Sequence, residues 1–197
     1  MAVFPSDHFV LEEAAFMTHV TAVARWVETH PDRIVLLGAP PSGPDVEYGW
    51  IERGEGLGET ESRAIFAIKH FWEKPSPAAA SAYLAAGCLW NTLVVVAKVR
   101  ALLRAGREQL PEVSGRLARI APFVGTEEEA WAVQQAYAFI PRANFSRAIL
   151  EPCPPALTVS ELPPLTWSDL GTPRRVFELL NRVEIRPSWL VASDLSA

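Results

Sequence analysis

Short runs of consecutive apolar residues constrain this fold more than any other feature of the sequence. The clearest are RIVLLGAP at 33–40 and CLWNTLVVVA at 88–97, in which apolar residues occupy neighbouring positions. A strand of this kind is buried on both faces, so helices must cover both sides of its sheet. Segments with helical spacing alternate with these runs, at 11–30, 77–86 and 172–182. The pattern predicts an α/β fold with a mixed, mostly parallel sheet and helices on both faces.

The remaining elements extend this pattern. Further apolar runs bounded by turn residues predict four more strands, at 2–6, 47–54, 64–75 and 156–162. The two middle strands are joined by GEGLGETES, a turn-rich hairpin loop. Residues 98–139 are expected to form helices broken at three residues, Gly106, Pro111 and Gly125. No linker divides the sequence, so we expect one domain at 1–182, followed by a tail at 183–197.

Composition and charge exclude several classes of protein. The formal net charge is −5, whereas a nucleic-acid-binding protein needs a basic face to neutralise phosphates. A membrane span needs about 20 apolar residues. The most apolar stretch, 83–99, is shorter than this and has Asn91 at its centre. The two cysteines, Cys88 and Cys153, form neither a disulfide framework nor a C-x-x-C metal motif. We therefore expect a cytoplasmic protein with no nucleic-acid partner and no membrane partner.

Charged residues at the ends of predicted elements are candidates for a functional site. Asp7 follows the first strand, where a carboxylate either binds a hard cation such as Mg²⁺ or caps the following backbone. Asp169 precedes a helix, and membership of the helix N-cap region is its simplest interpretation. Glu73 and Lys74 end a strand, either as a surface pair or as ligands for sugar hydroxyls and phosphate. The glycine-rich GEGLG at 54–58 runs from strand to strand, which favours a flexible hairpin over a phosphate-binding loop.

Five segments in a fixed order are more specific than any one of them. Along the chain they are VFPSDHFV, LLGAPPSGPDVEYGWIERGE, FWEKPSPAAASAYLAAGCLWNT, ANFSRAILEP and LTWSDLGTP. In this order they resemble the later part of a sugar-1-phosphate nucleotidyltransferase of the mannose-1-phosphate guanylyltransferase type. The resemblance runs from about residue 2 to about residue 182 and implies an incomplete Rossmann-like nucleotidyltransferase fold. The implied reaction transfers a nucleoside monophosphate, GMP from GTP, to a sugar 1-phosphate such as mannose 1-phosphate and releases pyrophosphate.

The resemblance implies three catalytic residues. Asp7 and Asp169 resemble the two carboxylates that hold the catalytic Mg²⁺. We therefore expect their oxygens to lie within roughly 5 Å of each other, since Mg²⁺ binds its ligands at about 2.0–2.1 Å. Lys74 resembles the lysine that meets the sugar phosphate. Phosphoryl transfer depends on such positioning and charge neutralisation, so no enzyme nucleophile is required.

The resemblance also implies contacts to the sugar. Glu73 is similar to the residue that receives the sugar hydroxyls, next to Lys74 at the phosphate end. Gly49, in EYGWI, resembles the backbone that lines the sugar, and Asn91, in LWNT, resembles a further polar contact. Together these residues would hold the hydroxyl and phosphate ends of one sugar phosphate.

The chain departs from the family pattern in three places. The N-terminal glycine-rich signature, with its Arg and following Lys, is absent, so the resemblance begins at the strand that carries Asp7. The family's Asn-Ser-Gly reads N-T-L at 91–93, and its later Asp-Tyr is replaced within F-S-R at 145–147. Two interpretations follow. The chain is a truncated guanylyltransferase-like enzyme, or it is a non-catalytic sugar-phosphate-binding or interaction module derived from that family.

The absent N-terminal strands predict how the isolated chain behaves. In the family they supply the nucleotide-binding part of the same sheet, so the strand at 2–6 should expose an apolar edge that pairs with another chain. We expect the isolated chain to self-associate, to bind GTP poorly and to release no pyrophosphate with mannose 1-phosphate. Light scattering and a coupled pyrophosphate assay test these points, and a monodisperse monomer that turns over GTP would contradict them.

Overall fold

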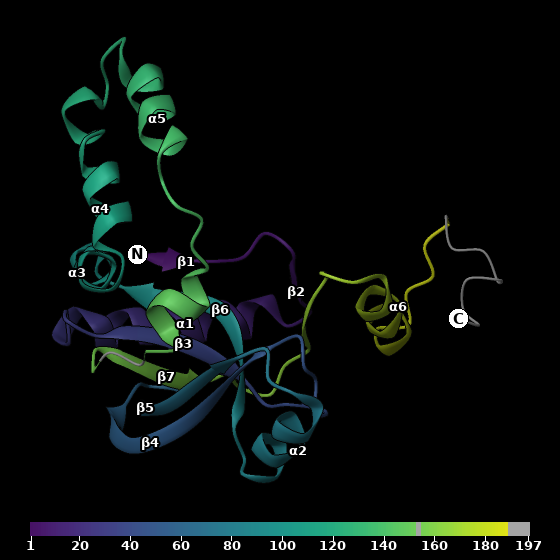
Figure 1. The fold of residues 1–197 in the computed structure, drawn as a ribbon. Helices are drawn as coiled ribbons and strands as arrows, with labels where there is room; N and C mark the ends of the chain where they lie inside the picture. The colour runs from purple at the N-terminus through teal and green to yellow at the C-terminus, as the bar shows by residue number, and fades with distance from the viewer. Residues whose placement is uncertain (153–154, 189–197) are drawn as a thin grey trace.

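A six-stranded sheet forms the centre of the computed structural model, which describes residues 1–152 and 155–188 (Figure 1). The strands lie in the order β1 (Ala2–Val3), β6 (Leu89–Ala97), β3 (Ile34–Ala39), β7 (Leu157–Glu161), β5 (Ala64–Glu73) and β4 (Gly49–Glu59). The first part of β4 also pairs with β6, so the sheet bends back on itself. A separate two-stranded sheet pairs β2 (His8–Val10) with β8 (Trp167–Asp169).

The α/β class is confirmed, but the expected mostly parallel direction of the strands is wrong. Within the described residues, β3 and β7 form a parallel pair and the other pairings are antiparallel. Apolar runs show only that both faces of a strand are covered. They carry no information on strand direction, and the direct β4–β5 hairpin is necessarily antiparallel.

Helices cover both faces of the sheet, as expected. Helix α1 (Glu13–Thr29) lies on one face, where its Val23 belongs to the same buried cluster as Val35 of β3. On the other face, α3 (Val99–Gln109) and a π-helical turn, η2 (Ser146–Leu150), enclose a second cluster. Residues alternate between these clusters along β3, which explains why the whole strand is apolar.

The remaining helices are α2 (Pro77–Ala85), α4 (Pro111–Ala118), η1 (Ala121–Phe123), α5 (Glu129–Ala138) and α6 (Pro173–Arg182). Helices α4 and α5 form an arm that projects from the body, and α6 lies at the opposite side of the molecule (Figure 1). Of the three expected breaks, the one at Gly106 is wrong, because α3 continues through it. The break at Pro111 is confirmed as the start of α4, and Gly125 has a positive φ of 78° between η1 and α5.

The first strand is shorter and more exposed than expected. It ends at Val3, and Val3 and Phe4 are 43% and 45% exposed. Pro5 follows, and a proline has no N–H to donate to a strand ladder. Strand β1 lies at one end of the strand order, and among the described residues it pairs with β6.

Some of the residues named in the sequence analysis lie outside the described part of the chain. These are Cys153 and residues 189–197 of the expected tail. Among the helices of residues 1–152 and 155–188, none combines the length and apolar character that crossing a membrane requires.

A buried histidine in α1 makes stability depend on pH. His19 is 1% exposed, and its Nδ1 lies 2.9 Å from Ser62 Oγ. Its Nε2 has no hydrogen-bond partner in the described part of the chain. Burial, with a smaller contribution from Arg63, lowers the pKa of His19 to about 4. The imidazole therefore stays neutral in the folded protein at pH values where the unfolded chain binds a proton.

We predict that the protein loses stability as the pH falls from 6.5 to 4. In this window the unfolded chain binds one more proton at residue 19, which costs the folded state about 3 kcal/mol in total. His8, whose pKa is also lowered mainly by burial, acts in the same direction. His19→Leu should therefore reduce the slope without abolishing it. Urea unfolding between pH 4 and 7.5 measures this, and an unchanged slope in the variant would contradict it.

Candidate functional site

The predicted sugar contacts gather where β4 begins, β5 ends and β6 begins. Gly49 lies directly opposite Glu73 in the β4–β5 pair, and Trp50 lies opposite Trp90 in the β4–β6 pair. Asn91 follows Trp90 in β6 and pairs with β3, which lies on the other side of β6 from β4. One end of the sheet thus brings together residues from three separate segments of the sequence.

Two side chains lie against Gly49 and leave no room for a Cβ. A Cβ at this position would lie 2.8 Å from Phe71 Cζ and 3.1 Å from Glu73 Oε2. The glycine therefore makes room first for the Phe71 ring and then for the Glu73 carboxylate. Burial raises the pKa of Glu73, while Ser146 and Arg147 of the neighbouring turn act to lower it.

Lys74 has an unusual backbone conformation. Its φ is +50°, in the left-handed region that few residues other than glycine adopt, and Pro75 follows it directly. Its ammonium is exposed and lies 3.0 Å from Glu47 Oε2, in the segment that leads into β4. Strain of this kind persists only where the surrounding structure fixes it, and it is common at ligand-binding positions.

Asn91 is buried and holds an irregular backbone in β6. Its Oδ1 accepts a hydrogen bond of 3.1 Å from the N–H of Leu93, which has a φ of +56°. The Thr92 hydroxyl donates to the Leu37 carbonyl oxygen at 2.7 Å. Leu93 stands at the position of the glycine in the family's Asn-Ser-Gly, and the positive φ explains why a glycine suits that position.

Asp7 and Asp169 come together at the small β2–β8 sheet. His8 is opposite Asp169, and the N–H of Leu170 donates to the Asp7 carbonyl oxygen at 2.7 Å. A Cβ built on Gly171 would lie 2.7 Å from Asp169 Oδ2 and 3.9 Å from Asp7 Oδ2. Both carboxylates therefore lie beside the Gly171 turn, while the separation of roughly 5 Å between their oxygens and their role as metal ligands stay predictions.

The carboxylate of Asp169 is held by three donors. The Tyr48 hydroxyl donates to Oδ1, while Arg175 Nη1 and the N–H of Gly171 donate to Oδ2 at 2.8 and 3.2 Å. Arg175 Nη2 also reaches Asp45 Oδ2 at 3.0 Å. The guanidinium lies 4.1 Å above the centre of the Tyr48 ring. Burial, reinforced by the hydrogen bond to Asp169, raises the pKa of Tyr48 well above its usual value.

Sequence reasoning missed these partners of Asp169. Tyr48 directly precedes Gly49 in EYGWI, so its position in the sequence could have marked it as a candidate site residue. Asp45 and Arg175 are 130 residues apart, and no local pattern marks them as partners.

Magnesium fits this site only in part. Asp7 and Asp169 offer the hard oxygen ligands that Mg²⁺ prefers, and Asp7 is exposed. However, both oxygens of Asp169 already accept hydrogen bonds. Within residues 1–152 and 155–188, no group of three or more His, Cys, Asp or Glu side chains is arranged to hold a metal ion. The two aspartates would therefore need other ligands to complete a site.

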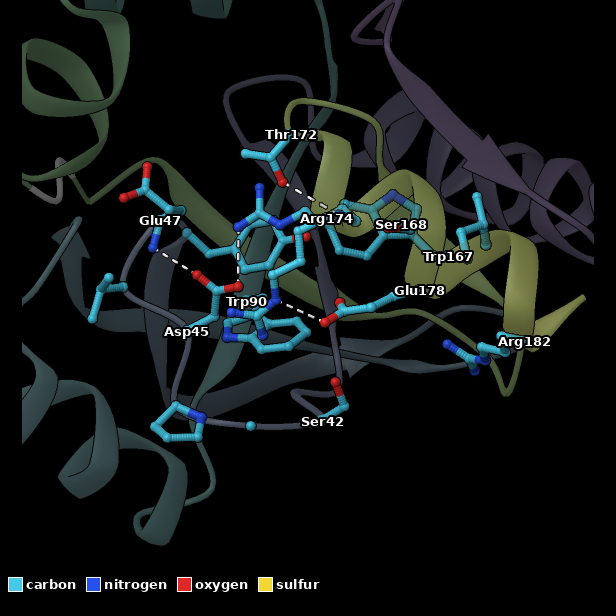
Figure 2. Close-up of a pocket in the computed structure, with 16 residues that line it drawn as sticks. Ser42, Asp45, Glu47, Trp90, Trp167, Ser168, Thr172, Arg174, Glu178 and Arg182 are labelled. Carbon is cyan, nitrogen blue, oxygen red and sulfur yellow. Dashed lines mark hydrogen bonds and ion pairs between the residues drawn. The ribbon is translucent and has the colours of Figure 1, made fainter. Parts of the chain in front are cut away.

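A cavity of about 950 Å³ lies beside this network, between the segment before β4 and helix α6 (Figure 2). Its lining includes the rings of Tyr48, Trp90 and Trp167 and the charged side chains of Arg174 and Arg182. The buried indole N–H of Trp90 has no hydrogen-bond partner among the described residues. None of the six residues singled out from the sequence lines the cavity, but Tyr48 and Arg175, which hold Asp169, do.

Comparisons with known proteins identify a family and relatives for this chain. A family model described as nucleotidyl transferase matches residues 1–185. Over 182 residues the chain is 30% identical to the xanthan biosynthesis protein XanB of Xanthomonas campestris pv. campestris (strain B100), covering 87% of this chain and 35% of that protein. It is 26% identical over 189 residues to the mannose-1-phosphate guanylyltransferase of Escherichia coli (strain K12), covering 91% and 37%.

A solved structure has a similar fold. It is described as a mannose-1-phosphate geranyltransferase from Thermus thermophilus and matches with a TM-score of 0.71 and 26% identity. The match covers 91% of this chain and 49% of that one. The chain therefore spans little more than a third of the length of the two curated relatives and about half of the solved chain. The expected α/β nucleotidyltransferase fold is confirmed.

The hydrogen bond from Tyr48 to Asp169 should contribute measurably to stability. We predict that Tyr48→Phe lowers the free energy of unfolding by about 1.5–3 kcal/mol, the range for hydrogen bonds to charged groups. Tyr137→Phe is the matched control, because Tyr137 is 63% exposed and its hydroxyl has no hydrogen bond in the described part of the chain. Urea unfolding followed by tryptophan fluorescence compares the two. Equal effects of the two substitutions would show that this hydrogen bond contributes nothing.

Proposed function

Because the chain belongs to the nucleotidyl transferase family, we propose that it supplies the sugar-phosphate side of a nucleotidyltransferase site. The reaction would transfer GMP from GTP to mannose 1-phosphate and release pyrophosphate. The names of the relatives and the ordered motifs support this choice of substrates. The proposal concerns the whole protein to which such a site belongs, in the cytoplasm, since the relatives are much longer than this chain.

One observation carries the proposal, namely that a single short segment joins the two halves of the site. Tyr48 donates a hydrogen bond to Asp169, and Gly49, the next residue, lies opposite Glu73. Lys74 follows Glu73 and contacts the segment on the other side of Tyr48 through Glu47. The candidate metal carboxylates and the candidate sugar contacts are therefore connected through residues 47–49.

The chemistry is an in-line displacement at phosphorus. A phosphate oxygen of the sugar 1-phosphate attacks the α-phosphorus of GTP, the new P–O bond forms, and the bond to the pyrophosphate oxygen breaks. Lys74 would leave Glu47 and neutralise the attacking phosphate, and Glu73 would accept hydrogen bonds from sugar hydroxyls. Asn91 would add a polar contact, while Gly49 would let the sugar approach the backbone. When bound, Mg²⁺ would be held by Asp7 and Asp169 and would neutralise phosphate charge.

Self-association remains part of the proposal. Strand β1 lies at one end of the strand order, and both Val3 and Phe4 are exposed there. An exposed strand edge with apolar side chains favours pairing with another chain.

Lys74 should dominate the affinity for the sugar phosphate. We predict that Lys74→Ala weakens mannose 1-phosphate binding by about 1.5–3 kcal/mol, because a charge-assisted contact to phosphate is lost. Lys69→Ala is the matched control, since Lys69 lies on β5, which ends just before Lys74, and its ammonium is likewise paired with a glutamate, Glu52, at 2.6 Å. Titration calorimetry measures both. The same affinity in the two variants would remove Lys74 from the site.

A further inference from the structure

Arg175 forms an ion pair of 2.8 Å with Asp169, one of the two candidate metal carboxylates. Its side chain is 11% exposed and that of Asp169 is 14% exposed, so water screens this ion pair weakly. The second nitrogen of the same guanidinium reaches Asp45 at 3.0 Å. The planar guanidinium thus forms ion pairs with two carboxylates at once, a geometry that a lysine cannot reproduce.

The hydrogen bonds of Asp169 leave little room for a second cation. A carboxylate offers about four acceptor positions, two on each oxygen. Oδ2 uses both of its positions for Arg175 Nη1 and the N–H of Gly171. Oδ1 accepts from Tyr48, so one position remains. The saturated oxygen, Oδ2, is the one that lies with Asp7 Oδ2 beside the Gly171 turn.

We propose that Arg175 is the resident counter-ion of Asp169, and that a divalent cation binds between Asp7 and Asp169 only by displacing the guanidinium. This inference rests on the proposed function, which assigns the two aspartates to the metal. A divalent cation and the guanidinium would repel each other strongly on Oδ2, whose acceptor positions are filled and which water screens weakly. Arg175 is therefore a positioning residue, and it sets how much divalent cation the site requires.

The displacement would also loosen helix α6. Arg175 belongs to the first turn of α6 and ties this helix both to Asp45, in the segment before β4, and to Asp169. Once a metal ion binds Asp169, Asp45 is the carboxylate among the described residues that still accepts a hydrogen bond from the guanidinium. Metal binding is thereby coupled to the contact between α6 and residues 45–48, which line the same cavity.

The neighbouring Arg174 provides a matched control. It lies on the same helix turn and carries the same charge, but it is 83% exposed and pairs with Glu178 at 2.7 Å (Figure 2). Arg174→Gln and Arg175→Gln change the net charge equally. A difference between these variants in metal affinity therefore reports contact with Asp169 and not a long-range charge effect.

The test measures binding of Mn²⁺ by electron paramagnetic resonance of the free ion. We expect Arg175→Gln to bind Mn²⁺ about tenfold more tightly than the wild type or better, because a nearby positive charge is removed. Arg174→Gln should stay within about twofold of the wild type, since an exposed charge is screened. Adding Asp7→Asn to Arg175→Gln should abolish the gain.

Each other outcome overturns a defined part of the argument. Equal affinities of Arg175→Gln and Arg174→Gln would overturn the role of Arg175 and leave the metal site intact. No Mn²⁺ binding by any variant would overturn the metal assignment and the inference together. A gain that survives Asp7→Asn would place the ion elsewhere and overturn the inference.

A measurement on the unmodified protein covers the case in which Arg175→Gln fails to fold. The side-chain N–H signals of Arg175 should be resolved by nuclear magnetic resonance while its guanidinium is held by two carboxylates. Addition of Mg²⁺ should merge them as rotation is released. The signals of Arg53, which pairs with Glu161 at 2.8 Å, should not change. Arg175 signals that ignore Mg²⁺ at concentrations where Mn²⁺ binds would overturn the inference.

Discussion

The carboxylate of Asp169 fixes the arrangement on which the rest of the site depends. It lies at the end of β8, in a sheet of two short strands that is separate from the main sheet. Hydrogen bonds from Tyr48 and Arg175 connect it to the start of β4 and to α6. A weakly exposed carboxylate must keep such donors, because leaving it unpaired would cost far more than any one hydrogen bond provides. The same requirement that holds the small sheet in place therefore also places Asp7 and Asp169 on the side of the main sheet where Tyr48 leads into β4.

Local backbone geometry completes the site at the ends of the strands. Gly49 leaves space for the Phe71 ring and the Glu73 carboxylate, both of which a side chain at position 49 would crowd. Lys74 turns the chain sharply at the end of β5, with a φ of +50° before Pro75. As a result, Glu73 and Lys74 do not simply point to opposite faces of an extended strand. The ammonium of Lys74 reaches Glu47, next to the residue that binds Asp169.

Much of the secondary structure could be predicted from the sequence, because apolar periodicity is a local property. Helix α1 and strands β3 and β6 lie where the pattern places them. Strand direction could not be predicted, since burial on both faces is the same for parallel and antiparallel neighbours. The first strand was expected to be longer because its residues are apolar, but Pro5 ends the ladder. The proximity of Asp7 and Asp169 was expected through the resemblance alone. The ion pairs of Arg175 depend on tertiary contacts that leave no pattern in the sequence.

The departures from the family motifs have different physical consequences. At Leu93 the backbone keeps the glycine-like φ of +56°, because the Asn91 side chain holds the N–H of Leu93. A leucine therefore adopts a left-handed conformation that is strained for any residue with a Cβ. Ser146 and Arg147 both affect Glu73, whose pKa is raised by burial. Ser146 opposes this rise through a hydrogen bond and Arg147 opposes it through its positive charge. A carboxylate in either position would instead raise the pKa of Glu73 further, because like charges disfavour the ionised form.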